Sequence, residues 1–221
     1  MGSANNTLSG GNNGTPAGTP ESIIVREGLN SNRDGLGFPF NTDTRDCLRF
    51  SDYGTIPTNE YISIPYSKGL QAISGVTISA WVKPLSISTI GIVHNITSNQ
   101  GYGLIVQNYN NTHLNPRAMI NSYADYSAGS DTYKINVGEW VHLTMIYNGA
   151  TNRIIWNGDG TTYSQARTGD IVHNTNAILI GQTHDGNKSH CLLDEVMIYT
   201  RAISDAEALK NYKHGKGKHK N

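Results

Sequence analysis

Residues His190 to Tyr212 read HCLLDEVMIYTRAISDAEALKNY, an apolar strand followed by a marked helix. Apolar side chains occupy both alternating faces of residues 191–199, and Asp194 and Glu195 interrupt them. Because neighbours in a strand point to opposite faces, we expect one carboxylate on each face. A carboxylate removed from water is costly unless it is hydrogen bonded, paired with a cation or bound to a metal. The pair therefore predicts either a structural ion pair or a cation site.

The second half of this stretch carries the start signals of a helix. Ser204 is placed as the N-cap, and Asp205 follows in the first turn near the positive end of the helix dipole. Glu207 completes a Ser-x-x-Glu capping box. We expect one short helix to begin directly after Ser204.

Other segments of the chain carry motifs that fit the same kind of fold. In chain order they are CLRF (47–50), EYISIP (60–65), VTISAWVKP (76–84), and GEWVHLTMIYNG (138–149) followed by RIIWNG (153–158). With residues 190–212, they resemble the motifs of laminin G-like jelly-roll domains, in the concanavalin A-like lectin/glucanase superfamily. The resemblance covers about residues 47 to 212. It implies an all-β fold, a two-sheet antiparallel jelly-roll sandwich with one short C-terminal helix, but no single function, because this superfamily hosts lectins, adhesins, spacers and hydrolases.

The composition favours the same fold class. Charged residues make up 15% of the chain, below the roughly 25% typical of globular proteins, while Gly, Asn, Ser and Thr are abundant. The formal net charge is zero, so global electrostatics do not direct the chain to nucleic acid or anionic lipid. No apolar run reaches membrane-spanning length, and we expect no signal peptide in this chain, because its first residues lack the charged and apolar regions of one.

We predict three regions. Residues 1–21 form a low-complexity N-terminal attachment arm without enough apolar surface to order itself, residues 22–212 form the sandwich, and residues 213–221 form a basic C-terminal tail. The tail is expected to be a solvated end, and the alternative is a contact for an acidic partner or nucleic acid. Within the sandwich, predicted strands are bounded by Gly, Asn or Pro, and they cover residues 47–50, 61–64, 76–83, 90–94, 102–107, 117–121, 131–135, 140–147, 153–156, 177–181 and 191–199.

Two cysteines, Cys47 and Cys191, lie on the expected first and last strands. In domains of the resembled family these strands lie close together, so a disulfide is compatible with the fold. The alternative is two separate buried thiols that act as small hydrophobic side chains. The sequence leaves both open.

Tyrosines alternate with amides and carboxylates between residues 102 and 126, and this mixture suits a sugar. Pyranose rings present C–H patches to aromatic faces and hydroxyls to amides and carboxylates. The predicted ligand-binding residues are Tyr102, Asn108, Tyr109, Asn110, Tyr123, Asp125 and Tyr126. The alternative is that these are ordinary surface tyrosines at strand ends. We expect the tryptophans Trp81, Trp140 and Trp156 to lie in the core rather than in a binding platform.

Catalysis finds little support in the sequence. The laminarinase-type glycosidases of this fold carry a Glu-x-Asp-x-(x)-Glu strand that sets two carboxylates on one face, and the chain has no such pattern. The histidines are scattered rather than set at metal-ligand spacing, and no Gly-x-Ser-x-Gly motif occurs. We therefore expect a protein that is not an enzyme.

The resemblance also implies a structural calcium near the Asp-Glu strand. Asp194 is the position that would carry over as a ligand, completed by an early loop such as Ser51-Asp52 and by backbone carbonyls. The alternative is that Asp194 is bonded to Arg49, Arg201 or backbone amides.

These features predict a non-enzymatic structural or adhesive surface protein. We expect a virion component, such as a phage decoration or fibre protein, whose residues 1–21 dock on a capsid or other particle surface, with a cell-surface glycan as a second partner. The alternative is a free-standing secreted lectin or carbohydrate-binding module. The expected location is the virion surface or the extracellular space, without membrane insertion or nucleic-acid binding.

Overall fold

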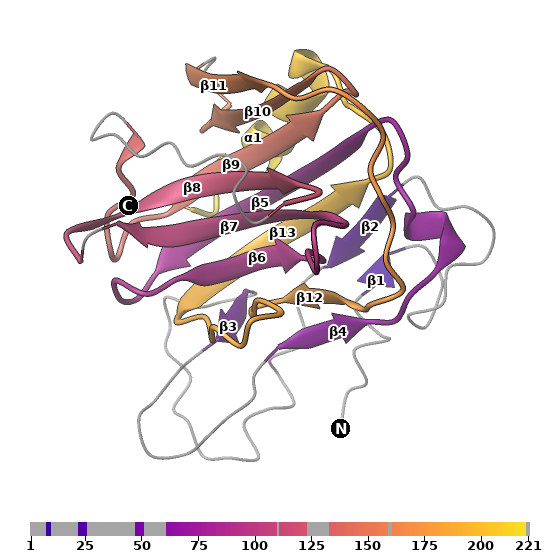
Figure 1. The fold of residues 1–221 in the computed structure, drawn as a ribbon. Coiled ribbons are helices and arrows are strands. Elements are labelled where there is room, and N and C mark those ends of the chain that lie inside the picture. Colours follow the sequence, from indigo (N-terminus) through magenta and orange to yellow (C-terminus); the bar gives the residue numbers. More distant parts are fainter. Residues whose placement is uncertain are drawn as a thin grey trace.

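The computed structural model describes residues 8–9, 22–25, 47–50, 61–109, 111–122, 133–158 and 161–219. These residues form two antiparallel sheets packed face to face (Figure 1). The larger sheet contains, in spatial order, β1 (Leu8–Ser9), β2 (Ser22–Val25), β13 (Cys191–Tyr199), β5 (Val76–Pro84), β9 (Val141–Tyr147), β10 (Thr151–Trp156) and β11 (Thr161–Ala166), and β3 (Leu48–Phe50) also pairs with β13. The smaller sheet contains β4 (Ile62–Ile64), β12 (Ile178–Ile180), β6 (Ile90–His94), β7 (Tyr102–Tyr109) and β8 (His113–Ile120). The predicted all-β jelly-roll sandwich is confirmed.

The main core lies between the two sheets and is almost entirely aliphatic. Strands β5, β6, β9 and β13 are buried along nearly their whole length, and their inward side chains include the fully buried Ile78, Ile92 and Leu143. Such burial excludes apolar surface from water and is the main stabilising contribution in a sandwich of this kind. The loops that connect the strands therefore lie at the two ends of the sandwich, outside this core.

Several strands differ from the predicted set, and β1 and β2 were not predicted. β8 begins at His113, four residues earlier than expected, and it includes Pro116. Proline is accepted there because β8 is the edge strand of its sheet, where one row of N–H groups has no partner strand. Strand β11 was not predicted, because its sequence TTYSQA is polar, as suits an edge strand. Of the predicted strand 131–135, the described part holds only an isolated bridge between Leu114 and Ile135.

The helix α1 (Asp205–Lys216) begins where the sequence predicts. The Ser204 hydroxyl accepts a hydrogen bond from the backbone N–H of Glu207, and the Glu207 carboxylate accepts one from the backbone N–H of Ser204, which completes the capping box. The helix covers the outer face of the larger sheet, where Ala208 packs with Ile146 and Ile155. It continues four residues beyond Tyr212, so part of the predicted tail is helical.

The C-terminal tail is a correction to the sequence prediction. After α1 the chain turns back on the sheet, and His219 is buried rather than solvated. Its ring lies 4.6 Å from the ring of Trp81 and 4.3 Å from that of Trp140. Both tryptophans are buried, as expected, although in a separate cluster outside the sheet rather than between the sheets. Trp156 is partly buried against the main core.

Asp194 and Glu195 do not point to opposite faces, so that prediction was wrong. The pairing of β13 with β5 shifts register between Asp194 and Met197, and Glu195 has a φ of +49°. This is a β-bulge, which re-aims a side chain by placing two residues opposite one. Both carboxylates therefore converge on the helix-covered face.

Cys47 and Cys191 are both buried, and no disulfide joins them. Burial raises the pKa of the Cys191 thiol, with a smaller contribution from Cys47. The structure thus has two thiols that serve as small apolar side chains.

Of the predicted arm, the structure describes Leu8 and Ser9, which pair with Val25 and Ile24 at the edge of the larger sheet. The other residues of the arm lie outside the described ranges. Within those ranges, no helix is both long enough and apolar enough to cross a membrane.

Candidate functional site

The predicted tyrosine and asparagine surface is divided between the two ends of the sandwich. Tyr102 begins β7 and pairs with Ile120, whereas Tyr109 ends β7 and pairs with His113. Seven residue steps along a strand span roughly 23 Å. One small sugar therefore cannot contact both tyrosines.

Tyr102 is a buried residue at the inner wall of the depression described below, rather than an exposed rim tyrosine. Its side chain is 2% exposed, and its hydroxyl donates a hydrogen bond of 3.1 Å to the carbonyl oxygen of Leu70. Burial raises the pKa of the phenol, because the charged form is poorly solvated there. The alternation of tyrosines with amides and carboxylates did not reveal which face of the strand the Tyr102 side chain occupies.

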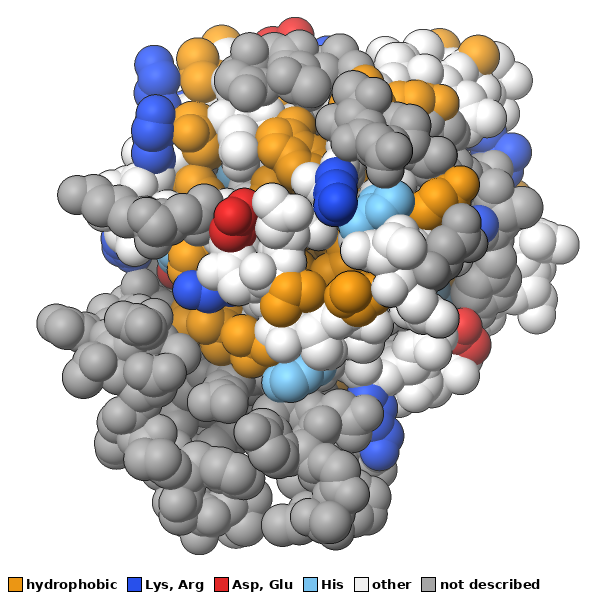
Figure 2. Space-filling model, turned by 90° about the vertical axis from the view of Figure 1, so that its left-hand side faces the viewer, with side chains coloured by type: hydrophobic (Ala, Val, Ile, Leu, Met, Phe, Trp, Pro, Cys, Tyr) orange, Lys and Arg blue, Asp and Glu red, His pale blue; other side chains and the backbone are white. Residues whose placement is uncertain are grey.

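The tip of the β7–β8 hairpin holds the described remainder of the predicted surface. The Asn108 amide shapes the turn, since its Nδ2 donates to Asn111 Oδ1 at 2.7 Å and its Oδ1 accepts from the Asn111 backbone N–H at 2.9 Å. Tyr109 is 37% exposed, and its ring lies 5.1 Å from that of His113. Figure 2 faces this end, where hydrophobic side chains are interspersed with polar ones. Asn110, Tyr123, Asp125 and Tyr126 lie outside the described residues.

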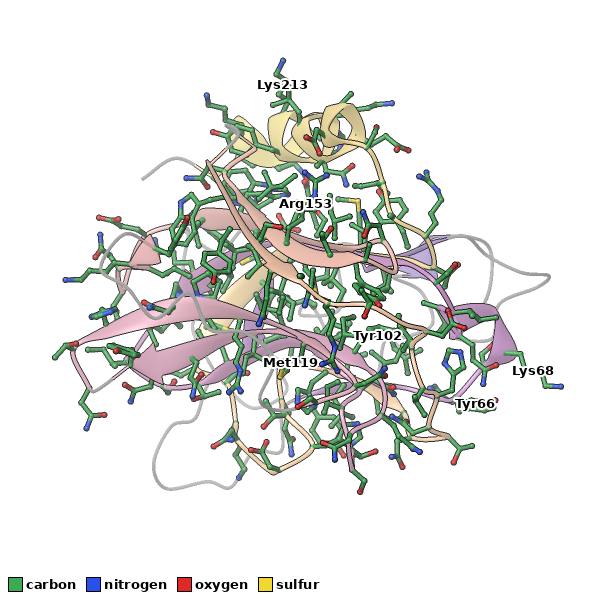
Figure 3. All side chains as sticks on the ribbon, turned by 45° about the horizontal axis from the view of Figure 1, so that its top comes forward. Tyr66, Lys68, Tyr102, Met119, Arg153 and Lys213 are labelled. Carbon is green, nitrogen blue, oxygen red and sulfur yellow. The ribbon has the colours of Figure 1, made fainter. Side chains whose placement is uncertain are left out.

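The opposite end carries a shallow depression. It lies beside η4 (Lys68–Leu70), a 3₁₀ helix, where the chain leaving β4 meets the segment that leads into β12. Figure 3 shows Tyr66 and Lys68 at this end, with Tyr102 further in between the sheets. Its lining includes one exposed and one buried aromatic ring, one imidazole and several amides, namely Tyr66, Tyr102, His173, Gln71, Asn95, Asn174 and Asn176.

Two side chains of the depression remain available to a ligand. Tyr66 is 41% exposed, and its hydroxyl is bonded at one side to Gln71 Nε2. His173 Nε2 is buried and has no hydrogen-bond partner among the described residues. Burial also lowers the pKa of His173, so the neutral imidazole is favoured at pH 7. A neutral imidazole nitrogen beside an aromatic ring can bond a hydroxyl group while the ring packs on apolar C–H groups.

The amides of the depression hold its wall in place. Asn95 Nδ2 donates to the carbonyl oxygens of Asn176 and Ala177, at 3.0 and 3.2 Å. Asn174 Nδ2 donates to the Asn95 carbonyl at 2.7 Å. Gly101 closes this network, because its φ is +96° and a Cβ there would lie 2.1 Å from the Asn95 carbonyl oxygen. The lining is therefore formed before any ligand binds.

Sequence reasoning did not find Tyr66 or His173. Each stands singly in a loop, and about a hundred residues separate them. The neighbouring turn residues of 174–176 were the available signal, but they indicate only a loop.

Asp194 lies in a second cluster, on the outer face of the larger sheet. Its Oδ1 accepts a hydrogen bond of 2.7 Å from the Glu195 backbone N–H, and its Oδ2 lies 3.1 Å from His219 Nε2. The predicted partner Arg201 instead pairs with Glu207, at 2.6 Å. The predicted calcium ligands Ser51 and Asp52, and the side chain of Arg49, lie outside the described residues.

The donors around Asp194 fit calcium poorly. Calcium takes 6 to 8 oxygen ligands, typically carboxylates, carbonyls and water. Here the third donor is an imidazole nitrogen, and the indole rings of Trp81 and Trp140 flank it. We derive no role for calcium from this donor set.

Among the described residues, one buried serine–histidine pair is present. Ser79 Oγ lies 3.0 Å from His142 Nε2, and both side chains are fully buried. Burial, with a smaller contribution from His219, lowers the pKa of His142 to about 3. The pair is therefore a polar contact inside the fold.

Comparison with known proteins agrees with this architecture. Residues 54–208 match a family model described as the concanavalin A-like lectin/glucanases superfamily, of laminin G type, so the chain belongs to this family. No curated protein sequence matches the chain.

Solved structures share the fold at low sequence identity. A heptameric SAP-like pentraxin from Limulus polyphemus has a TM-score of 0.58 and 17% identity, over 73% of this chain and 78% of that one. Domain 4 of AbnA, a GH43 extracellular arabinanase from Geobacillus stearothermophilus, solved with arabinotriose, has a TM-score of 0.54 and 19% identity, over 89% and 82%. The binding domain of Paraclostridial Mosquitocidal Protein 1 has a TM-score of 0.59 and 18% identity, over 96% of this chain and 53% of that one. At these identities the likeness shows the fold alone.

Proposed function

We propose that this chain is a non-catalytic carbohydrate-binding domain of an adhesive surface protein, and that the depression beside Tyr66 and His173 holds the glycan. The observation that carries the proposal is the buried, unpartnered Nε2 of His173 next to the exposed ring of Tyr66. A buried polar atom without a partner is costly, and a sugar hydroxyl would satisfy it. The arabinotriose bound to the arabinanase domain supports this choice by analogy.

The ligand that suits the depression is neutral. Its lining carries amides, two phenols and an imidazole, without a carboxylate or a cation among the described lining residues. A site of this kind recognises hydroxyl groups and C–H faces rather than an acidic sugar. We therefore expect a neutral hexose or pentose unit, bound one sugar at a time.

The predicted residues Tyr123, Asp125 and Tyr126 stay in the proposal. They follow Asn121, whose Nδ2 donates to the Asp170 carbonyl and whose Oδ1 accepts from the Val172 backbone N–H, both at 2.8 Å. These bonds hold Asn121 beside residues 170–172, which lead directly to His173. These residues are candidates for the outer side of the same site.

The test is a glycan array probed with a multivalent display of the domain, because a shallow site binds a single sugar weakly. Wild-type protein should bind arrays of neutral glycans, and His173→Ala should lose that binding. The matched control His214→Ala changes an exposed histidine on α1, and it should bind as the wild type does. If the wild type binds no glycan, the proposal fails and the domain is a structural spacer.

We further propose that many copies of the chain are carried on one surface, such as a virion, through residues 1–21. The support is compositional, since this arm is rich in Gly, Asn, Ser and Thr and has little apolar surface. Weak single sites become useful when many copies act together, which favours a particle over a free monomeric lectin. Deleting residues 1–21 should change the stability by no more than about 1 kcal/mol and abolish attachment. Unaltered attachment of the truncated chain would contradict this role, and the secreted-lectin alternative would then stand.

A further inference from the structure

Three buried metal-ligating side chains meet beneath α1, away from the depression. Asp194, Glu195 and His219 each offer one ligand atom, and these atoms lie within 4.8 Å of one another. Their exposed fractions are 4%, 7% and 9%. The bulge at Glu195 supplies the two carboxylates, and the turn after α1 supplies the imidazole.

Two atoms of the cluster lack hydrogen-bond partners among the described residues. Glu195 Oε2 is buried and unpartnered. His219 Nε2 also makes no hydrogen bond, since its 3.1 Å approach to Asp194 Oδ2 is not aligned for one. Native structures leave few buried polar atoms unsatisfied, and a bound ion is one way in which such atoms are satisfied. Both orphaned atoms belong to side chains that point into the same small space.

The charges of the cluster are not balanced from within. Two buried carboxylates face a single buried imidazole, which carries at most one positive charge. On the open side, the Lys218 Nζ atom lies 3.5 Å and the His214 Nε2 atom 3.8 Å from Glu195 Oε1. Burying unbalanced charge is costly, and a divalent cation would neutralise both carboxylates.

We propose that Asp194, Glu195 and His219 bind a zinc ion, with His214 or water as the fourth ligand. Zinc takes carboxylate oxygens and imidazole nitrogens in tetrahedral geometry, whereas calcium requires more oxygen donors. With zinc–ligand bonds of about 2.1 Å, tetrahedral ligands lie roughly 3.4 Å apart. The 3.1 Å between Asp194 and His219 is close to this spacing, and the ligand atom of Glu195 lies within 4.8 Å of both.

The helix end is shaped to close over this site. Gly215 lies against it, and a Cβ there would lie 2.1 Å from Trp81 Nε1 and 2.7 Å from Glu195 Oε2. Only glycine allows α1 to approach so closely. A bound ion would therefore fasten the C-terminal turn to β13, and the adjacent Trp81 and Trp140 would report it by their fluorescence.

The test is a titration of chelator-treated, dialysed full-length protein with zinc, calcium or magnesium alone. Zinc should bind with one-to-one stoichiometry, change tryptophan fluorescence, and raise Tm by roughly 5 to 10 °C at 100-fold excess over Kd. Calcium and magnesium should have little effect. The cobalt form should show the visible absorption of tetrahedral coordination.

Variants separate a metal site from an ion pair. Glu195→Gln and His219→Ala should each weaken zinc binding at least tenfold, while Lys218→Ala should keep it. His173→Ala should retain zinc binding and lose glycan binding, so the two proposals fail independently. The zinc site is overturned if zinc leaves Tm unchanged, if calcium stabilises more than zinc, or if the zinc effect survives in both Glu195→Gln and His219→Ala.

Discussion

His219 Nε2 lies 3.1 Å from Asp194 Oδ2, so the C-terminal turn contacts the middle of strand β13. The tail is therefore part of the packed structure, and it covers Trp81 and Trp140. Removing the imidazole takes away the side chain that lies nearest to a buried carboxylate oxygen, which is a costly change.

His219→Ala should consequently lower the free energy of unfolding by about 2 to 4 kcal/mol in chelator-containing buffer. Denaturant titration followed by tryptophan fluorescence measures this. His214→Ala is the control, because this side chain is 72% exposed, and it should change the stability by less than about 0.5 kcal/mol. Equal stabilities for the two variants would show that the tail does not dock.

The bulge at Glu195 gives a second prediction. Two substitutions at this position separate the effect of backbone conformation on stability from the effect of losing the carboxylate. Both Glu195→Ala and Glu195→Gly remove the carboxylate, but only glycine adopts a φ of +49° without strain. Glu195→Gly should therefore be more stable than Glu195→Ala by about 1 kcal/mol, measured by thermal or denaturant unfolding. The opposite order would mean that the residue is not in the left-handed conformation.

Acid should destabilise the domain through His94. Burial, with a smaller contribution from His184, lowers the pKa of His94 to about 4 in the folded chain, compared with the ordinary histidine value of 6.5. Between these values the unfolded state binds more protons, so stability is present above pH 6.5 and is lost as the pH falls toward 4. The loss from this group is on the order of 3 kcal/mol.

His94→Gln isolates that contribution, since glutamine does not titrate and can still accept the backbone N–H of His184, which donates to His94 Nδ1 at 3.1 Å. Unfolding free energies at pH 7 and pH 4.5 should differ less in the variant than in the wild type. Parallel pH profiles for the two proteins would rule out a titrating His94.

Tyr102→Phe tests whether Tyr102 is structural. Loss of the hydroxyl removes the bond to the Leu70 carbonyl and should cost about 1 kcal/mol of stability. Because the ring remains in the core, glycan binding should stay within about twofold of wild type. A loss of glycan binding at unchanged stability would return Tyr102 to the binding surface.

Local chemistry explains why much of the fold could be predicted from sequence. The capping box at Ser204 and Glu207 depends on residues three apart, so it is visible in the chain. The bulge at Glu195 was not visible, because no glycine marks its left-handed residue. One unrecognised bulge was enough to reverse the predicted direction of a carboxylate.

The candidate sites depend on contacts that sequence does not reveal. Tyr66 and His173 meet because two distant loops close one end of the sandwich, and His219 reaches Asp194 only after α1 has folded back on the sheet. Tyr102 and Tyr109 share one tyrosine-rich segment but lie at opposite ends of an eight-residue strand. Proximity in the chain was therefore a poor guide to proximity in the site.

The central claim is that glycan binds at the Tyr66 end and not at the hairpin tip. Tyr66 and Tyr109 make a matched pair, since they are 41% and 37% exposed and lie at opposite ends. The most direct measurement is the affinity of Tyr66→Ala and Tyr109→Ala for a glycan that the wild type binds. The account predicts about a tenfold loss for Tyr66→Ala, from the lost ring contact, and no more than a twofold change for Tyr109→Ala. A loss confined to Tyr109→Ala would contradict it and move the site to the β7–β8 hairpin.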